Sequence, residues 1–332
     1  MSTITPAPGV AVSGAFATSP AYSGTFIPAI WSGKLIANFY AASTFADVCN
    51  RDYEGEISKM GDKVVINTTP ALTINNYVAG TSLTYGVPTP GNIELNIDRA
   101  KYFAYQVNDV LDYQSKPDLM DTFSGDAGER MRVAIDSDCF YRTFSDAAAA
   151  NKGATAGVGS ASYNLGTDAA PVTLTAANVL QKILEMASVL DEQNIPNEGR
   201  FLILGPQDRT LLMQSELRQA YLTGDAKSPM RNGLLGEIDR FKLYVSNLLP
   251  KATAATNAPW ISGDGSDTSI TSTGGPRRLI VAGHRSAMTF ASQITKTEEV
   301  RNPNDFGDYV RSLQVYGVKT VNPKALTVAV VK

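Results

Sequence analysis

Residues 306–326 read FGDYVRSLQVYGVKTVNPKAL, a stretch that decides the fold class of the chain. Apolar and polar side chains alternate along Val310–Val321, which is the period of a strand with one buried face. Asn322 and Pro323 form a turn signal, and Ala325–Val331 returns to a strand-like pattern. Because long helical patterns precede these two strands, the sequence predicts an α+β fold without internal repeats.

A long β-hairpin is predicted upstream of this region. Lys63–Asn67 is rich in β-forming residues, and apolar residues alternate strictly along Ile93–Asp98. Tyr102–Val107 continues the second pattern, so that strand is expected to run for about 15 residues, or roughly 50 Å. The connection between the two strands carries turn-forming residues: Gly80, Gly86, Pro88, Pro90 and Gly91.

Three helical patterns stand out. Pro28–Val48 has apolar residues near helical spacing, and a proline is tolerated in a first turn. A long helix with two apolar faces is expected to open at Ser115, with Pro117 in its first turn. A third helix is expected over Thr175–Gln193, with an inward side formed by Val179, Leu180, Ile183, Leu184, Ala187 and Leu190.

Shorter elements fill the remainder of the chain. A short helix is expected at Pro206–Ser215, because a proline suits a first helical turn. Polar, glycine-rich stretches at 151–173 and 250–276 are expected to be surface loops. Short apolar strands are expected at Phe201–Leu204, Phe241–Val245 and Leu279–Ala282.

Overall composition excludes several classes of protein. A net charge of -3 and a pI near 5.4 argue against a protein that grips nucleic acid tightly, since such binders carry a clustered basic excess. No apolar run is long enough to cross a bilayer, and the first charged residue is Lys34, which does not fit a signal peptide. Cys49 and Cys139 are expected to be reduced and buried, as in a cytoplasmic protein.

The distribution of charge is more informative than its total. Charged residues make up 18% of the chain, against roughly 25% in an ordinary soluble domain. Residues 1–33 carry no Asp, Glu, Lys or Arg, and neither do residues 64–93. Such segments have little to keep them soluble alone, so we expect them to be buried against partners.

No residue pattern predicts a catalytic, cofactor or metal site. His284 is the only histidine and is expected to be an ordinary polar residue that follows a strand. Asp264 and Asp267 lack the alternating ligands of a calcium loop, while Asp305 and Asp308 fit a turn better than a carboxylate pair. We therefore expect a protein that is not an enzyme and that binds no cofactor or metal.

Two further patterns have ordinary structural explanations. Gly153, Gly157 and Gly159 follow a helix and lack the Gly-Lys-Ser/Thr ending of a phosphate-binding loop, so they predict a surface loop. Asp126 and Arg130 stand four residues apart on the long helix and are expected to form a supporting ion pair.

Five stretches, in order along the chain, resemble coat proteins of tailed double-stranded-DNA phages. They are GDKVVI (61–66), DAGERMRVAIDSD (126–138), GEIDRFKLYVSNLLP (236–250), AGHRSAMTFASQI (282–294) and FGDYVRSLQVYGVKTVNPKAL (306–326).

This resemblance implies the Hong Kong ninety-seven phage shell fold for a structural major capsid protein, with the following parts. The expected domains are an N-terminal arm (1–30), an arm helix region (31–54), an extended loop (55–109), a peripheral domain with a long spine helix (110–150), an axial domain (151–290) and peripheral C-terminal strands (291–332).

Three departures from the family pattern qualify the resemblance. Arg240 stands where relatives often have Gly, so the entry to the following strand is expected to differ. Residues 64–100 contain no Lys, which puts covalent lysine-to-asparagine crosslinking in doubt. The N-terminal region looks too short for a built-in scaffolding domain.

The resemblance also implies partners. The chain is expected to bind copies of itself in hexamers and pentamers, and to work with a separate scaffolding protein, a portal and, in some shells, a cement protein. It is expected to contact packaged DNA only weakly and no membrane, to assemble in the host bacterial cytoplasm and to reside in the virion. The expected inter-subunit contact residues are Phe26, Tyr77, Val78, Leu83, Tyr85 and Val87.

Three alternatives stay open. An encapsulin, whose shell holds an enzyme cargo, would share the fold, but the sequence shows no obvious cargo-binding feature and its C-terminal region is closer to phage coat proteins. A hydrolase with an unrecognised site would need activity without a visible acid–base set. A phage tail or surface-adhesion protein is the third.

Overall fold

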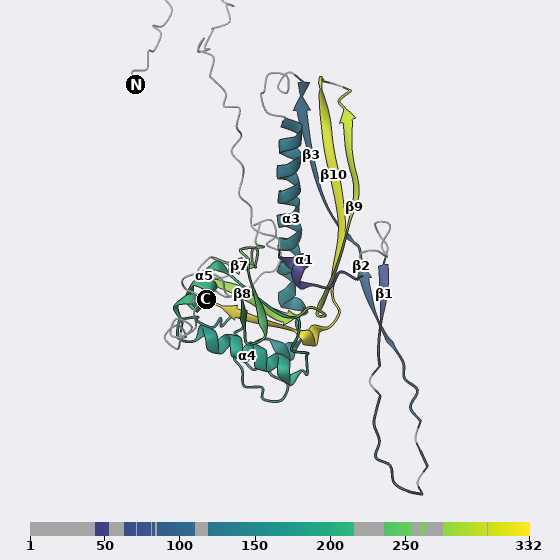
Figure 1. Cartoon of the computed structure of the whole chain (residues 1–332), viewed down its shortest axis with the longest axis vertical. Coiled ribbons are helices and arrows are strands. Elements are labelled where there is room, and N and C mark those ends of the chain that lie inside the picture. Colours follow the sequence, from purple (N-terminus) through teal and green to yellow (C-terminus); the bar gives the residue numbers. More distant parts are fainter. Residues whose placement is uncertain are drawn as a thin grey trace, which may run out of the picture. The chain divides into compact units, whose positions relative to one another are not determined.

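A long helix, two larger β-sheets and a two-stranded β-ribbon form most of the described structure (Figure 1). The chain divides into two units, Met1–Ile36 and Ala37–Lys332, and everything described below belongs to the second. The computed structural model describes residues 44–52, 63–70, 72–80, 82–83, 85–109, 119–215, 236–253, 260–262, 275–303 and 305–332.

The first sheet has three antiparallel strands in the order β3 (Arg99–Asn108), β10 (Gly307–Thr320) and β9 (Met288–Arg301). The strand expected at the start of this C-terminal region is thus confirmed as β10, and it lies in the centre of the sheet. β9 was not predicted. Its pairing with β10 contains a register shift between Leu313 and Gln314, which breaks the simple alternation that marks a strand in sequence.

Helix α3 (Leu119–Asp146) runs beside this sheet (Figure 1). The expected opening residues, Ser115 and Pro117, lie outside the described residues. Asp138 on the helix accepts hydrogen bonds from Arg99 of β3 at 2.5 Å and from the Tyr316 hydroxyl of β10 at 2.9 Å. Burial, together with the Asp138 carboxylate, raises the pKa of the Tyr316 phenol, so this hydroxyl stays a donor.

The second sheet has six strands, in the order β11-β8-β4-β6-β5 with β7 beside β8. β4 and β6 are parallel and the other pairs are antiparallel. The strands expected in this part of the chain are confirmed. Their bounds are β4 (Arg200–Leu204), β5 (Glu237–Ile238), β6 (Phe241–Val245), β7 (Lys251–Ala252), β8 (Arg277–His284) and β11 (Leu326–Val331).

Two helices accompany the larger sheet, with α4 (Val179–Glu192) packed against β11 and α5 (Pro206–Gln214) against α4. Leu184 was expected to face inward, but it is 43% exposed because the buried stripe centres on Ile183 and Leu190. Met186 and Val189 complete that stripe instead. Short 3-10 turns lie at Ala149–Asn151 (η2) and Pro323–Ala325 (η4).

The predicted long hairpin is divided differently from the expectation. β1 (Lys63–Thr68) pairs with β2 (Gly91–Asn96), but the single strand of about 15 residues predicted from Ile93 onward is wrong. The chain changes partner at Ile97 and Asp98, because β2 bonds to β1 whereas β3 bonds to β10. The sequence pattern predicts one continuous strand, but the ladder of backbone hydrogen bonds is interrupted at these two residues.

Both cysteines lie in the main core, where they are buried and not disulfide-bonded, as expected. Cys139 is 1% exposed, and burial raises the pKa of its thiol well above the usual value. Cys139 is therefore protonated at neutral pH, and burial shields both thiols, so they react slowly with soluble reagents.

A buried carboxylate holds the start of the described chain against the long helix. α1 (Phe45–Val48) is the only described part of the helix expected over Pro28–Val48. The Asp136 side chain of α3 accepts hydrogen bonds from the backbone N–H groups of Thr44 at 2.8 Å and Phe45 at 3.1 Å. Since Asp136 is 5% exposed, these amides have little access to water as an alternative acceptor.

Asp136→Ala is expected to lower the free energy of unfolding by about 2–4 kcal/mol, because it leaves two buried N–H groups without this acceptor. Urea denaturation of the unassembled subunit measures the change. The control is Asp126→Ala, which removes the confirmed 3.0 Å ion pair with the exposed Arg130 and should cost less than about 1 kcal/mol. Equal losses in the two variants would show that Asp136 does not hold the start of the described chain against the long helix.

Arg240, which stands where relatives often have Gly, lies in a tight turn. Asp239 and Arg240 form the two-residue turn between β5 and β6, with φ angles of 43° and 68°. Such a turn favours Gly because both positions are left-handed. The Arg240 guanidinium instead donates to Asn197 at 2.8 Å and to Asp191 at 3.0 Å. This half-exposed pairing partly offsets the backbone strain.

Arg240→Gly should therefore be more stable than Arg240→Ala by about 1 kcal/mol. Both variants lose the same side-chain contacts, so their difference isolates the cost of a Cβ atom in the left-handed region. Thermal unfolding of both variants supplies the comparison. Equal stability would show that the turn relaxes to another conformation when the arginine is removed.

Candidate assembly surface

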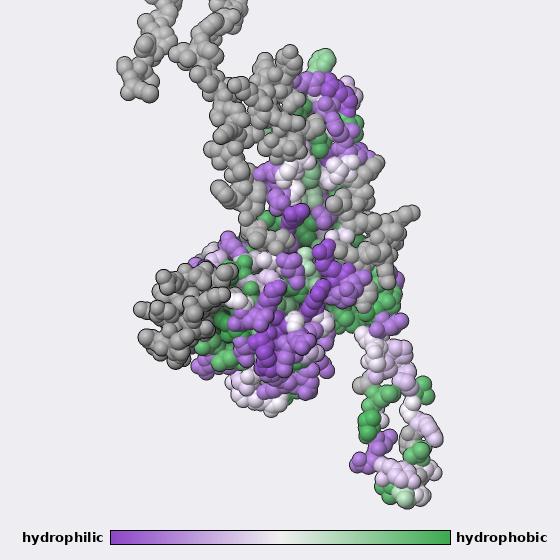
Figure 2. Space-filling model, in the orientation of Figure 1, coloured by the Kyte–Doolittle hydropathy of each residue, from purple (hydrophilic) through white to green (hydrophobic). Residues whose placement is uncertain are grey.

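The connection between β1 and β2 is the most exposed apolar segment that the structure describes (Figure 2). All described residues from 72 to 92 are exposed. Tyr77 is 75% exposed, Tyr85 85% and Val87 88%. Large apolar side chains so open to water, in a segment without a charge, indicate a surface that becomes covered by a partner.

The residues predicted as inter-subunit contacts mostly belong to this loop. Tyr77, Val78, Leu83, Tyr85 and Val87 are all exposed there, while Phe26 lies outside the described residues. Their contact role stays a prediction. Two equally exposed neighbours, Leu72 at 67% and Ile74 at 91%, were not singled out although they lie in the same uncharged stretch.

The base of the loop is held by a small core of its own. Ile66 of β1 and Leu95 of β2 are buried together with Ala291 of β9 and Val315 of β10. At Gly317 a Cβ atom would lie 2.4 Å from the backbone oxygen of Asn96, so only glycine lets the hairpin base approach β10 this closely. The base is therefore fixed where the loop itself is exposed.

A second exposed surface is the face of the three-stranded sheet turned away from α3. Tyr105 contacts Phe123 of α3 edge to face, with ring centroids 6.0 Å apart, which places Tyr102 on the opposite face of β3. Tyr102 is 77% exposed, and Tyr309 and Val300 on the neighbouring strands are 37% and 43% exposed. This face has no signal in the sequence, because it depends on which strands become neighbours.

Charged residues form ion pairs at one end of the same sheet. Arg301 of β9 donates to Asp109 and, at 3.2 Å, to Asp308 of β10. The hydrogen bond from Arg301 lowers the pKa of the Asp109 carboxyl. Asp305 accepts the N–H of Phe306 at 2.8 Å within the turn. Asp305 thus serves the turn, as expected, whereas Asp308, also expected in a turn, lies in β10 and pairs with Arg301 at the end of the sheet.

The remaining candidates for chemistry have local partners. His284 Nδ1 lies 2.8 Å from the Ser286 hydroxyl within one turn. Glu192 accepts the N–H of Gly159 at 2.8 Å and steadies the glycine-rich loop. Asp264 and Asp267 lie outside the described residues. Within the part of the chain that is described, no group of three potential ligands could hold a metal, and no helix is long and apolar enough to cross a membrane.

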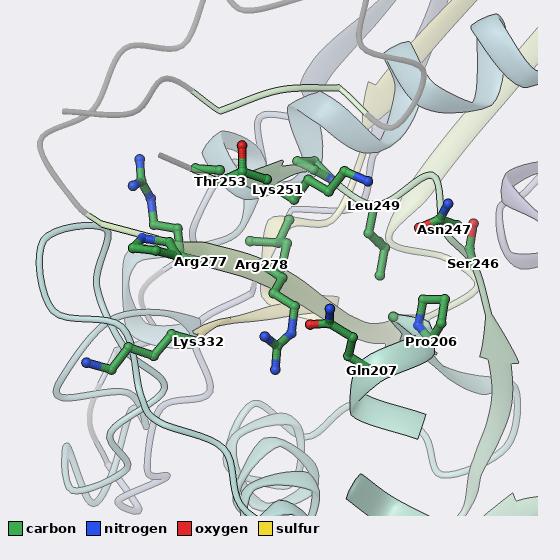
Figure 3. A pocket seen from close by; sticks show the side chains of 15 residues that line it. Pro206, Gln207, Ser246, Asn247, Leu249, Lys251, Thr253, Arg277, Arg278 and Lys332 are labelled. Atoms are coloured by element: carbon green, nitrogen blue, oxygen red, sulfur yellow. The ribbon is translucent and has the colours of Figure 1, made fainter. Parts of the chain in front are cut away.

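A cavity of about 420 Å³ beside β8 is lined by several cations (Figure 3). Arg277 and Arg278 project to opposite sides of the strand, so their charges do not converge on one ligand. Arg277 lies 2.5 Å from Asp168, and Arg278 lies 2.7 Å from Asp208. Each of the two arginines thus forms an ion pair with a carboxylate of the same chain. The two side chains therefore do not form an anion-binding site in this cavity.

Comparison with known proteins identifies the class. Residues 92–329 match the family described as phage capsid protein, so the chain belongs to that family. No curated protein matches the chain. The protein is accordingly a structural capsid protein of phages with the major capsid fold predicted for it.

Solved phage structures share the fold of this chain. One from Mycobacterium phage Che8 is 26% identical, with a TM-score of 0.68 over 92% of this chain and 97% of that one. The capsid of cyanophage P-SCSP1u is 15% identical, with a TM-score of 0.67 over 90% of each chain. The mature capsid of bacteriophage PhiM1 is 16% identical, with a TM-score of 0.61 over 91% and 90%.

Limited proteolysis should reveal the exposure of the loop. Chymotrypsin is expected to cleave unassembled subunits after Tyr77 and Tyr85, because exposed segments outside a ladder fit a protease site. The buried Tyr141 and Tyr316 serve as internal controls and should be cut far more slowly. Mass spectrometry of early fragments identifies the sites. Comparable resistance at all four tyrosines would mean that the loop is covered in the subunit.

Proposed function

We propose that the chain assembles with copies of itself, as hexamers and pentamers, into an icosahedral shell around the double-stranded-DNA genome of a tailed phage. Membership of the phage capsid family supports this proposal. Closed symmetric assembly gives each copy the same set of neighbours, so one exposed surface can be covered in every subunit.

The observation that carries the proposal is the loop between β1 and β2. It presents Tyr77, Val78, Leu83, Tyr85 and Val87 to solvent from a base that is buried in the chain's own core. We assign these side chains, together with Phe26, to contacts between subunits. An uncharged apolar loop on a fixed base is suited to a partner surface and poorly suited to water.

Further partners complete the proposal. A separate scaffolding protein, a portal and, in some shells, a cement protein would act with the chain during assembly in the host bacterial cytoplasm. The finished chain would reside in the virion and touch packaged DNA only weakly, which its net charge of -3 supports. We propose no catalytic role and no cofactor or metal.

The six expected domain ranges also remain our proposal. They would give an arm (1–30), an arm helix region (31–54), an extended loop (55–109), a spine-helix region (110–150), an axial domain (151–290) and peripheral strands (291–332). Two strand pairings connect these ranges. β3, in the extended-loop range, pairs with β10, in the range of the peripheral strands. β11, in the same range as β10, pairs with β8 of the axial range.

Tyr85→Asp is expected to prevent shell formation or strongly lower its yield. A carboxylate buried without a partner costs on the order of several kcal/mol at each contact, and every subunit repeats that cost. Tyr77→Asp should act in the same direction. Electron microscopy and sedimentation of the expressed protein measure the particle yield.

Tyr85→Phe is the matched control, because it keeps the ring and introduces no charge. The unassembled subunits of all three variants should melt within about 2 °C of the unsubstituted chain, since an exposed side chain has few internal contacts to lose. Normal, heat-stable shells from both Asp variants would show that the loop faces solvent in the shell.

A further inference from the structure

Three buried aromatic rings join α1, α3 and β9 in the main core. The ring of Phe45 on α1 meets that of Phe140 on α3 edge to face, with centroids 5.1 Å apart. It meets the ring of Phe290 on β9 in the same way at 5.9 Å. α1 is therefore packed against both the long helix and a strand of the three-stranded sheet (Figure 1).

The two cysteines of the chain lie beside these rings and belong to the same buried core. Cys139 directly precedes Phe140 on α3. Cys49 follows α1, and its N–H donates to the carbonyl oxygen of Phe45 at 3.3 Å, which places it one helical turn beyond that residue. Each cysteine is thus close, along its own segment, to a ring that contacts the other segment.

Met288 of β9 is a second point at which the surroundings of the two cysteines meet. Asn50, the residue after Cys49, donates its N–H to the carbonyl oxygen of Met288 at 2.9 Å. Met288 and Cys139 also line the same polar cavity, of about 220 Å³, between β2, α3 and β10. Cys49 is in addition one of the groups that raise the pKa of the Cys139 thiol, which agrees with a short separation of the two sulfur atoms.

We propose that Cys49 and Cys139 are a latent disulfide pair, reduced while the chain assembles and joined in the finished virion. The inference rests on the proposed function, in which the chain passes from a reducing cytoplasm to an oxidising exterior. The bond ties the start of the described chain to α3, at the place where the Asp136 carboxylate holds it by hydrogen bonds.

The reaction needs a small oxidant, and hydrogen peroxide is sufficient. Cys139 lines the cavity, so its sulfur reacts first: it loses its proton, attacks the peroxide and becomes a sulfenic acid, with release of one water molecule. The Cys49 sulfur then displaces the sulfenic hydroxyl, which leaves with the Cys49 proton as a second water molecule. The two thiols together lose two electrons, and the peroxide gains them.

Burial sets the rate of this reaction. Cys139 is 1% exposed and the pKa of its thiol is raised, so little thiolate is present to attack an oxidant at neutral pH. Assembly in a reducing cytoplasm is therefore complete before the bond forms. A virion outside the cell meets oxidants for far longer, so a slow reaction is sufficient there.

Peptide mapping of the full chain tests the pairing. Purified subunits and shells are held in dilute hydrogen peroxide under native conditions, denatured in an alkylating reagent and digested without reductant. We expect a peptide that links Cys49 to Cys139, loss of both alkylatable thiols, and return of both after treatment with dithiothreitol. Since unassembled subunits can be mapped as well as shells, a failure of shell formation is distinguishable from a failure of the pairing.

Cys49→Ala and Cys139→Ala are the matched controls. Peroxide should raise the melting temperature of the unsubstituted chain by roughly 5 °C or more, because the bond closes a loop of about 90 residues, and should raise that of neither variant. Both variants keep the eight methionines, so they also report any effect of methionine oxidation.

Three results would overturn the pairing. The first is oxidation of the thiols to sulfinic acid without a linked peptide, and the second is a disulfide that forms only between chains. The third is a pair of thiols that stays fully alkylatable after prolonged treatment of the native protein with peroxide.

Discussion

The close approach of the Asn96 backbone oxygen to Gly317 is the constraint on which the exposed loop depends. A Cβ atom at position 317 would lie 2.4 Å from that oxygen, and 2.8 Å from the Ile97 side chain. At this point the chain passes from β2, which pairs with β1, to β3, which pairs with β10. Because β10 is central in its sheet and bonded to α3 through Tyr316 and Asp138, the hairpin base rests on the most firmly connected strand.

Individual elements were readable from sequence, but their partners were not. The patterns at Phe241–Val245 and Phe201–Leu204 predict strands because a few adjacent residues suffice to define them. The partner change at Ile97 leaves no such local mark. Apolar residues hold odd positions on both sides of it, up to Ile97 and again from Phe103, while the strands that decide the pairing lie far away in sequence. β9 was missed for a related reason, since its alternation is interrupted opposite Leu313.

For the candidate surface, too, composition predicts which residues take part, whereas their arrangement depends on strand pairing. The absence of charge from Val64 to Ile93 was sufficient to single out Tyr85 and its neighbours. It could not show that the base of this loop is buried against β9 and β10, because that depends on which strands become neighbours. The exposed sheet face around Tyr102 had no signal at all, since its members come together only when three distant strands pair.

The uncharged composition of the loop also determines how solution conditions act on a contact made through it. Such a contact has no Coulombic component for mobile ions to screen, so moderate sodium chloride should leave its strength nearly unchanged. Apolar hydration instead dominates, which makes the contact weaker on cooling and stronger in sulfate. In free subunits the same lack of charge means that no electrostatic repulsion keeps the exposed loops of different chains apart. Unassembled chains held at high concentration therefore tend to aggregate through this segment.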